Sequence, residues 1–221
     1  MDETRTEVKT EELAAPSQEA VEAAKIEDGQ NIWNNTVMYA TAVKQAKILA
    51  SSDLVPEGTY RGHPANCLIA LDMAYRTGLS PLTVMQNLYV VKGKPGWSGQ
   101  YCISAINSCG KFSPLRFIRI VDPNDEMKTR GYYAQATRIS TGEICEGAPV
   151  TWDMVKGEGW LDKNGSKWKT MPEQMFMYRC AAFFARTYCP ECLNGLQTVE
   201  ELKDVNGYDE PTRKRTVVTI E

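Results

Sequence analysis

The order of hydrophobic patterns along the chain constrains its fold more strongly than any single motif. Helical spacing occupies three segments in the first half and one near the end: residues 31–50, 65–77, 81–85 and 172–188. Alternation typical of strands occupies three segments between them: residues 116–121, 132–140 and 143–150. Thr141-Gly142 is a turn signal, so we expect these three strands to pair as one antiparallel sheet, to which residues 88–91 can add a strand. The sequence therefore predicts an α+β fold with helices packed around a short antiparallel β-sheet.

Capping residues place the ends of the predicted helices. Gly78 stops the helix over 65–77, and Ser80-Pro81 supplies an N-cap and a first helical residue for the next one. Pro172 opens the last helix. Two side-chain stripes follow from the helical spacing: Trp33, Val37, Ala40 and Lys44 in the first helix, and Phe176, Cys180, Phe183 and Thr187 in the last.

Charge is unevenly distributed along the 221 residues, whose net charge is −3. Residues 1–28 hold nine Asp or Glu and three Lys or Arg, which leaves 19 acidic and 22 basic residues, a net charge of about +3, in the remainder. We expect an acidic, disordered or weakly helical tail over 1–29, a folded core over 30–200 and a polar tail over 201–221. An acidic tail on a mildly basic body suits a nucleic-acid binder, because the tail can compete with phosphate. A tail that is merely solvated is the alternative.

Seven cysteines without a signal-peptide pattern favour reduced thiols in a cytosol-like compartment. No apolar run approaches the roughly 18–20 residues that span a bilayer. Cys189-Pro-Glu-Cys192 has metal-ligand spacing, but a structural zinc site needs four ligands and the sequence offers no second pair of this kind. We therefore expect no metal and no cofactor, with a zinc protein using Cys189 and Cys192 as an alternative.

Residues 88–112 are predicted to form a strand, a turn and a helix, with Ser98 placed to cap the helix. Four side chains at this junction suit phosphate and base binding: Lys92, Lys94, Trp97 and Gln100. The segment GKPGWSG lacks the order of a nucleotide-binding P-loop, and the single histidine, His63, stands in a loop. These features favour a binding protein over an enzyme.

Arg179 and Arg186 are seven residues apart in the last helix, so they project from nearly the same face, about 10 Å apart. Such a pair can contact successive phosphates of an extended strand. Two surface arginines in ion pairs are an equally good interpretation. Upstream, Trp168 stands between Lys167 and Lys169, which fits base stacking with backbone neutralisation. It also fits a loop whose tryptophan turns inward while its lysines stay outside.

Three blocks along residues 68–198 carry a family resemblance. They are IALDMAYRTGLSPLTVMQNLYVVKGKPGWSGQ, SAINSCGKFSPLRF and GSKWKTMPEQMFMYRCAAFFARTYCPECLNGLQT, in this order. Together they resemble the RecT/Redβ family of phage and prophage single-strand annealing proteins (recombinases). The first is similar to the family's helix, turn and strand, the second to its next helix and first sheet strand, and the third to its arginine-bearing last core helix.

The resemblance implies ATP-independent binding of single-stranded DNA and annealing of complementary strands, through a duplex intermediate, in homologous recombination and DNA repair. It implies a homo-oligomeric ring or helical filament in the cytoplasm of a bacterial host, with DNA in a basic groove. The partners that the resemblance implies are a phage 5′→3′ exonuclease and a host single-strand binding protein. The family's groove positions match Arg179 and Arg186, and in the turn segment Lys92, Lys94, Trp97 and Gln100, whereas Glu173 stands where the family has a basic residue. The residues leave two alternatives open: a metal-dependent nucleic-acid-processing enzyme and an oligomeric phage structural protein.

Overall fold

The computed structural model describes residues 31–205. The acidic tail predicted over 1–29 lies outside these residues, as does the predicted polar tail after residue 205. Within them, helices and two small antiparallel sheets follow one another along the chain. The predicted α+β class is therefore confirmed.

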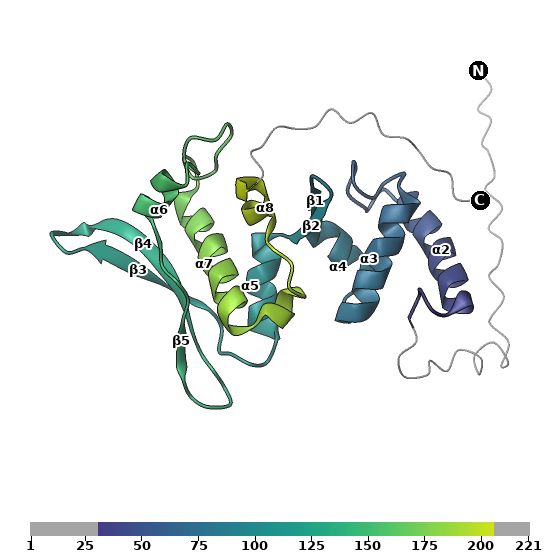
Figure 1. Ribbon diagram of the computed structural model, residues 1–221, viewed down its shortest axis with the longest axis horizontal. Coiled ribbons are helices and arrows are strands. Elements are labelled where there is room, and N and C mark those ends of the chain that lie inside the picture. The colour runs from purple at the N-terminus through teal and green to yellow at the C-terminus, as the bar shows by residue number, and fades with distance from the viewer. Residues whose placement is uncertain (1–30, 206–221) are drawn as a thin grey trace, which may run out of the picture.

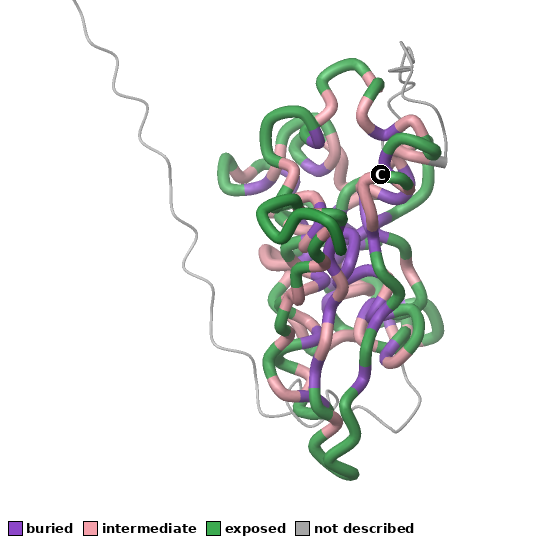
Figure 2. The backbone as a smooth tube through the Cα atoms, turned by 90° about the vertical axis from the view of Figure 1, so that its left-hand side faces the viewer, coloured by how far each residue is buried: buried purple, intermediate pink, exposed green. Residues whose placement is uncertain are grey.

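The elements lie in three groups along the molecule (Figure 1). At one end is a layer of three helices: α2 (Thr36–Ala50), α3 (Pro64–Thr77) and α4 (Pro81–Asn87). The middle holds three more: α5 (Gly99–Ser108), α7 (Pro172–Tyr188) and α8 (Val199–Val205). At the other end is a sheet of four strands: β3 (Arg116–Asp122), β4 (Asp125–Thr137), β5 (Ile144–Glu146) and β6 (Val150–Thr151). Buried residues concentrate in the interior of the molecule and exposed ones in its loops (Figure 2).

α2 packs on α3 through small side chains. Asn35 caps α2 by accepting two backbone hydrogen bonds from its first turn. The buried residues of α2 are one turn apart: Ala42, Ala46 and Ala50. The stripe predicted from Trp33 to Lys44 is exposed, and Trp33 itself precedes the helix. Alanines occupy the contact instead, since their small side chains let the two helices approach closely.

The predicted start and stop residues of the next two helices are confirmed. α3 ends at Gly78, which adopts the left-handed conformation with φ 69°. Ser80 caps α4, because its hydroxyl accepts the backbone N–H of Thr83 at 3.2 Å, and Pro81 is the first helical residue. Local chemistry thus sets where α3 ends and where α4 begins.

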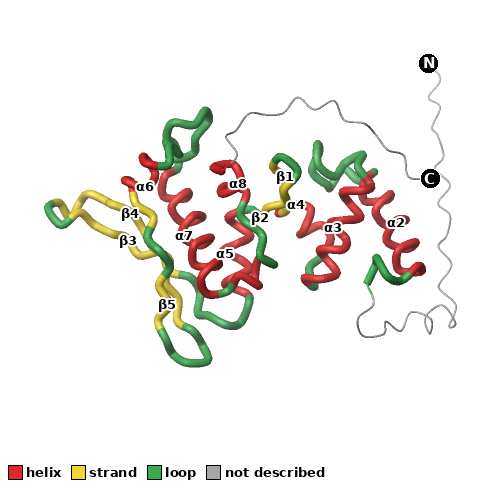
Figure 3. The backbone as a smooth tube through the Cα atoms, viewed as in Figure 1, coloured by secondary structure: helices red, strands yellow, loops and turns green. Residues whose placement is uncertain are grey.

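β1 (Leu88–Val91) and β2 (Lys94–Trp97) form an antiparallel hairpin of their own. The two turn residues, Lys92 and Gly93, have positive φ values of 49° and 82°, as a tight two-residue hairpin turn requires. The expectation that residues 88–91 join the larger sheet is wrong, because their partner is the next segment of the chain. Figure 3 shows helices between this hairpin and the other strands.

The larger sheet confirms the predicted antiparallel pairing. Its order is β3-β4-β5, and β6 pairs with β4. At the predicted Thr141-Gly142 turn, the N–H of Gly142 donates to the Arg138 carbonyl at 2.8 Å. β4 carries buried side chains on the face that meets α7: Tyr132, Ala134 and Ala136. Gly131 admits β6, because a Cβ atom there would lie 2.1 Å from the Val150 carbonyl oxygen.

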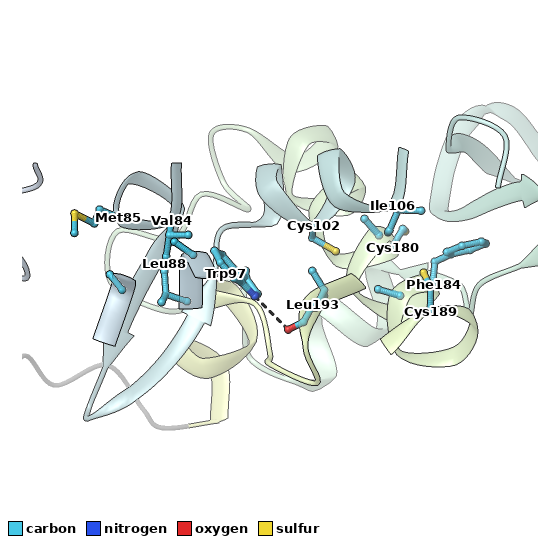
Figure 4. Close-up of a cluster of buried hydrophobic side chains, with 14 of the residues drawn as sticks. Val84, Met85, Leu88, Trp97, Cys102, Ile106, Cys180, Phe184, Cys189 and Leu193 are labelled. Atoms are coloured by element: carbon cyan, nitrogen blue, oxygen red, sulfur yellow. Dashed lines mark hydrogen bonds between the residues drawn. The ribbon is translucent and has the colours of Figure 1, made fainter. Parts of the chain in front are cut away.

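α7 forms the centre of the core and has the predicted bounds, from Pro172 to Tyr188. Of the predicted stripe, Phe176 and Cys180 are buried, Phe183 is half-buried and Thr187 is exposed. Phe184, outside that stripe, is fully buried. Figure 4 shows this core continuing through α5 to the β1–β2 hairpin. The hairpin and α7 therefore belong to one packed unit.

The polar tail predicted from residue 201 begins inside a packed helix. α8 covers Val199–Val205 and starts with a capping box, in which the N–H of Thr198 donates to Glu201 Oε2 at 2.8 Å. Leu202 is buried against Gly96, where a Cβ atom would lie 2.6 Å from Leu202 Cδ1. The folded core thus extends beyond the predicted boundary at residue 200.

Candidate nucleic-acid interface

Arg179 lies inside the protein. Only 4% of it is exposed, and its guanidinium carbon lies 4.1 Å from the centre of the Trp160 ring. Its Nη2 forms an ion pair with the Asp204 carboxylate of α8 and donates to the Glu200 carbonyl oxygen at 3.5 Å. Burial lowers the pKa of Arg179 to about 10, while Glu201 and Glu200 act in the opposite direction, so the guanidinium is charged at neutral pH.

Arg186 and Lys163 meet the same helix. The side chain of Arg186 is 49% exposed and its Nη2 lies 2.5 Å from Glu201 Oε1. Lys163, between α6 (Trp152–Gly157) and α7, donates to Asp204 Oδ1 at 2.6 Å. We call Lys163, Arg179 and Arg186 the arginine site.

Both predicted arginines therefore face α8, in agreement with their seven-residue spacing. The ion-pair interpretation is confirmed for both of them. The surface position assumed for Arg179 is wrong, because Trp160 and α8 cover its guanidinium. In this conformation Arg186 is the more accessible of the two to a phosphate.

The lysine loop, residues 160–170, keeps its tryptophans inside. Trp168 is buried, with its ring centre 5.5 Å from that of Trp160 and 4.9 Å from that of Phe176. Lys167 and Lys169 are exposed, line a hollow together with Lys163, and form no ion pair with another of the described residues. The inward-tryptophan interpretation is confirmed, and Trp168 has no free face for a base.

The four predicted residues of the hairpin segment also divide into one buried aromatic side chain and three exposed polar ones. Trp97 is fully buried: its ring stacks on Tyr101 at 4.1 Å, and its Nε1–H donates to the Leu193 carbonyl at 3.2 Å (Figure 4). Lys92, Lys94 and Gln100 are exposed at the turn and at the start of α5. The two lysines can therefore reach a phosphate, whereas Trp97 is a core residue without a surface on which a base can stack.

The cysteines of the Cys189-Pro-Glu-Cys192 segment lie at the end of α7 and in the short 3-10 helix η1 (Pro190–Leu193). Burial raises the pKa of the Cys189 thiol, which favours its neutral form. Over residues 31–205, no three His, Cys, Asp or Glu side chains cluster closely enough to hold a metal ion. Within the same range, no helix has the length and apolar character needed to cross a bilayer.

Two features of the surface were not predicted from the sequence. The first is a set of exposed basic side chains on the β3–β4 hairpin: Arg116, Arg119, Lys128 and Arg130. Two of them have an acidic neighbour, Asp122 at 3.5 Å from Lys128 and Asp153 at 3.8 Å from Arg130. The second is the acidic helix α8. Its Thr198-x-x-Glu201 pattern is a helix-start signal that could have revealed it.

Comparison with known proteins identifies no relative of this chain. No family model matches the chain, and no curated protein or solved structure matches it significantly. The functional assignment therefore rests on the side chains of this chain and on the resemblance of its three sequence blocks.

Proposed function

We propose that this protein binds single-stranded DNA and anneals complementary strands without ATP, as the resemblance to the RecT/Redβ family implies. The observation that carries the proposal is a row of cations beside α7. Lys167 and Lys169 share a hollow with Lys163, Lys163 and Arg179 share Asp204, and Arg186 lies two turns further along the helix. From its first residue to Arg186, α7 rises about 21 Å, which is long enough to follow several phosphates of an extended strand.

The distribution of aromatic side chains suits annealing. Trp97 and Trp168 are buried, so neither tryptophan of the candidate interface offers a ring on which a base can stack, while its lysines are exposed. Cations that neutralise phosphates leave the base edges free to pair with a second strand, and neutralisation also reduces the repulsion between two strands. No hydrolysis is needed for either effect.

Exposed apolar side chains on the helical layer support assembly into a homo-oligomer. Val37, Ile48, Leu54 and Ile69 are each more than half exposed. Assembly strengthens a weak site, because linked subunits bind one strand at high effective concentration. We expect light scattering to show a ring or filament whose mass exceeds that of one chain, and a monomer at every concentration contradicts this part of the proposal.

The decisive experiment adds two complementary oligonucleotides in succession to the purified protein, without ATP or metal, over a series of salt concentrations. We expect faster duplex formation at low salt that fades as salt rises, because salt competes with the protein cations for phosphate. Absence of acceleration and of single-strand binding at every salt concentration refutes the proposal and favours an oligomeric structural protein. Magnesium-dependent loss of the strands favours a nucleic-acid-processing enzyme instead.

Lys167→Ala with Lys169→Ala tests the exposed part of the row. Removing two phosphate contacts should weaken single-strand binding and reduce the slope of log K against log salt by about 1.4, at about 0.7 for each contact. The matched control is Lys44→Ala with Lys47→Ala, which removes two exposed lysines from α2 at the other end of the molecule. Equal slopes in the two double variants contradict a binding role for the lysine loop.

The biological setting that this function implies is phage-type homologous recombination in the bacterial cytoplasm. Its partner classes are a 5′→3′ exonuclease that produces the single strand and a host single-strand binding protein.

A further inference from the structure

Two carboxylates of α8 form ion pairs with all three cations of the arginine site. Asp204 pairs with both Arg179 and Lys163, and Glu201 pairs with Arg186. A carboxylate presents to a guanidinium the same kind of anionic oxygen as a phosphate does. The acids of α8 therefore occupy positions where the phosphates of a bound strand would be stabilised.

The anchoring contacts of α8 and its acidic contacts involve different side chains. The chain is held at Trp97, whose N–H donates to the Gln197 carbonyl at 3.0 Å, just before α8 begins. Leu202 packs on Gly96 of the hairpin, whereas Glu201 and Asp204 reach the cations of α7 and the lysine loop. α8 has only seven residues. Its acidic contacts can therefore be released while the chain stays attached at Trp97.

The match between α8 and the arginine site leaves buried polar atoms without hydrogen bonds. Arg179 Nε and Glu200 Oε2 are buried and have no hydrogen-bond partner among residues 31–205. A buried N–H donor without an acceptor is unfavourable. A guanidinium is stabilised best by an anion that accepts hydrogen bonds from several of its N–H groups at once. A phosphate offers more acceptor oxygens than the single Asp204 carboxylate that faces Arg179.

We propose that α8 is an exchangeable acidic cover of the arginine site, which a single strand displaces when its phosphates bind Lys163, Arg179 and Arg186. This inference rests on the proposed function and adds a conformational step to it. In the covered protein Lys167 and Lys169 are exposed and Arg186 is half-exposed, and the guanidinium of Arg179 becomes available only once α8 has moved. A polyanion that binds only weakly to the exposed lysines therefore does not reach the whole row of cations beside α7.

The test removes the two negative charges of α8 that contact the arginine site and keeps the size of both side chains. Glu201→Gln with Asp204→Asn keeps the side-chain sizes, and glutamine also serves in a capping box. The matched control is Asp53→Asn with Glu57→Gln, which makes the same change in net charge and releases an exposed arginine, Arg61, from two acidic partners. The assay is fluorescence anisotropy of a labelled thymidine oligonucleotide over a series of salt concentrations.

The cover variant should bind about tenfold more tightly than the control at low salt, because the strand no longer has to displace two carboxylates. Its slope should be similar to that of the control, because the same cations contact phosphate in both complexes. A second measurement uses the unaltered protein: the amides of residues 199–205 should exchange hydrogen faster once the oligonucleotide is added. Identical binding of the two variants, or slower exchange of α8 in the complex, overturns the cover while salt-sensitive binding by the unaltered protein still supports the proposed function. If no form of the protein binds the oligonucleotide, both the function and the cover are overturned.

Discussion

Replacing Trp97 by phenylalanine separates a structural role from a nucleic-acid-binding role for this side chain. The substitution removes the hydrogen bond from Nε1 to the Leu193 carbonyl, and that oxygen still accepts the N–H of Leu196 at 2.9 Å. The loss therefore costs about 0.5–1.5 kcal/mol. The smaller ring also leaves space beside Tyr101, and the lost contacts cost about another 1–2 kcal/mol. We expect the free energy of unfolding to fall by about 1.5–3.5 kcal/mol. For a chain of this length, that lowers the midpoint temperature by about 3–14 °C.

Circular dichroism during thermal and denaturant unfolding measures this loss, and Trp33→Phe provides the control. Trp33 is 52% exposed, so its replacement should change the free energy of unfolding by no more than about 0.5 kcal/mol. At a temperature where both variants are folded, we expect each to bind single-stranded DNA as the unaltered protein does. A Trp97→Phe variant that keeps its stability and loses DNA binding refutes the buried placement of this residue.

Two further predictions follow from the burial of Arg179 and of the thiols. Arg179→Met leaves Asp204 without its buried partner and should lower the free energy of unfolding by about 2–3 kcal/mol. The half-exposed Arg186→Met should lower it by no more than about 1 kcal/mol; equal losses in denaturant unfolding contradict the difference in burial. Burial also raises the pKa of Cys180 to about 12, so this thiol keeps its proton at pH 8 and reacts slowly with a disulfide reagent. Of the seven cysteines, only the partly exposed Cys109 and Cys192 should react within minutes in the folded protein, and rapid reaction of a third contradicts the described core.

Local signals in the sequence were sufficient for several element boundaries. Gly78 ends α3, Ser80 caps α4 and Pro172 opens α7, because each acts through its own backbone or through a hydrogen bond within one turn. The Thr141-Gly142 turn likewise brings β4 and β5 together over a few residues. The α8 helix escaped detection because seven residues are too few to show a clear apolar period, although its capping box lies at its start.

The sequence by itself determined the class of elements, their order, and the presence of basic and aromatic side chains in the candidate interface. The tertiary structure alone decided which of those side chains reach the surface. Trp97 is buried through Leu193, 96 residues away, and Arg179 is covered by Asp204 across the gap between two helices. Spacing within one helix places two arginines on one side but does not reveal what packs there, because burial depends on segments that meet only after the chain has folded.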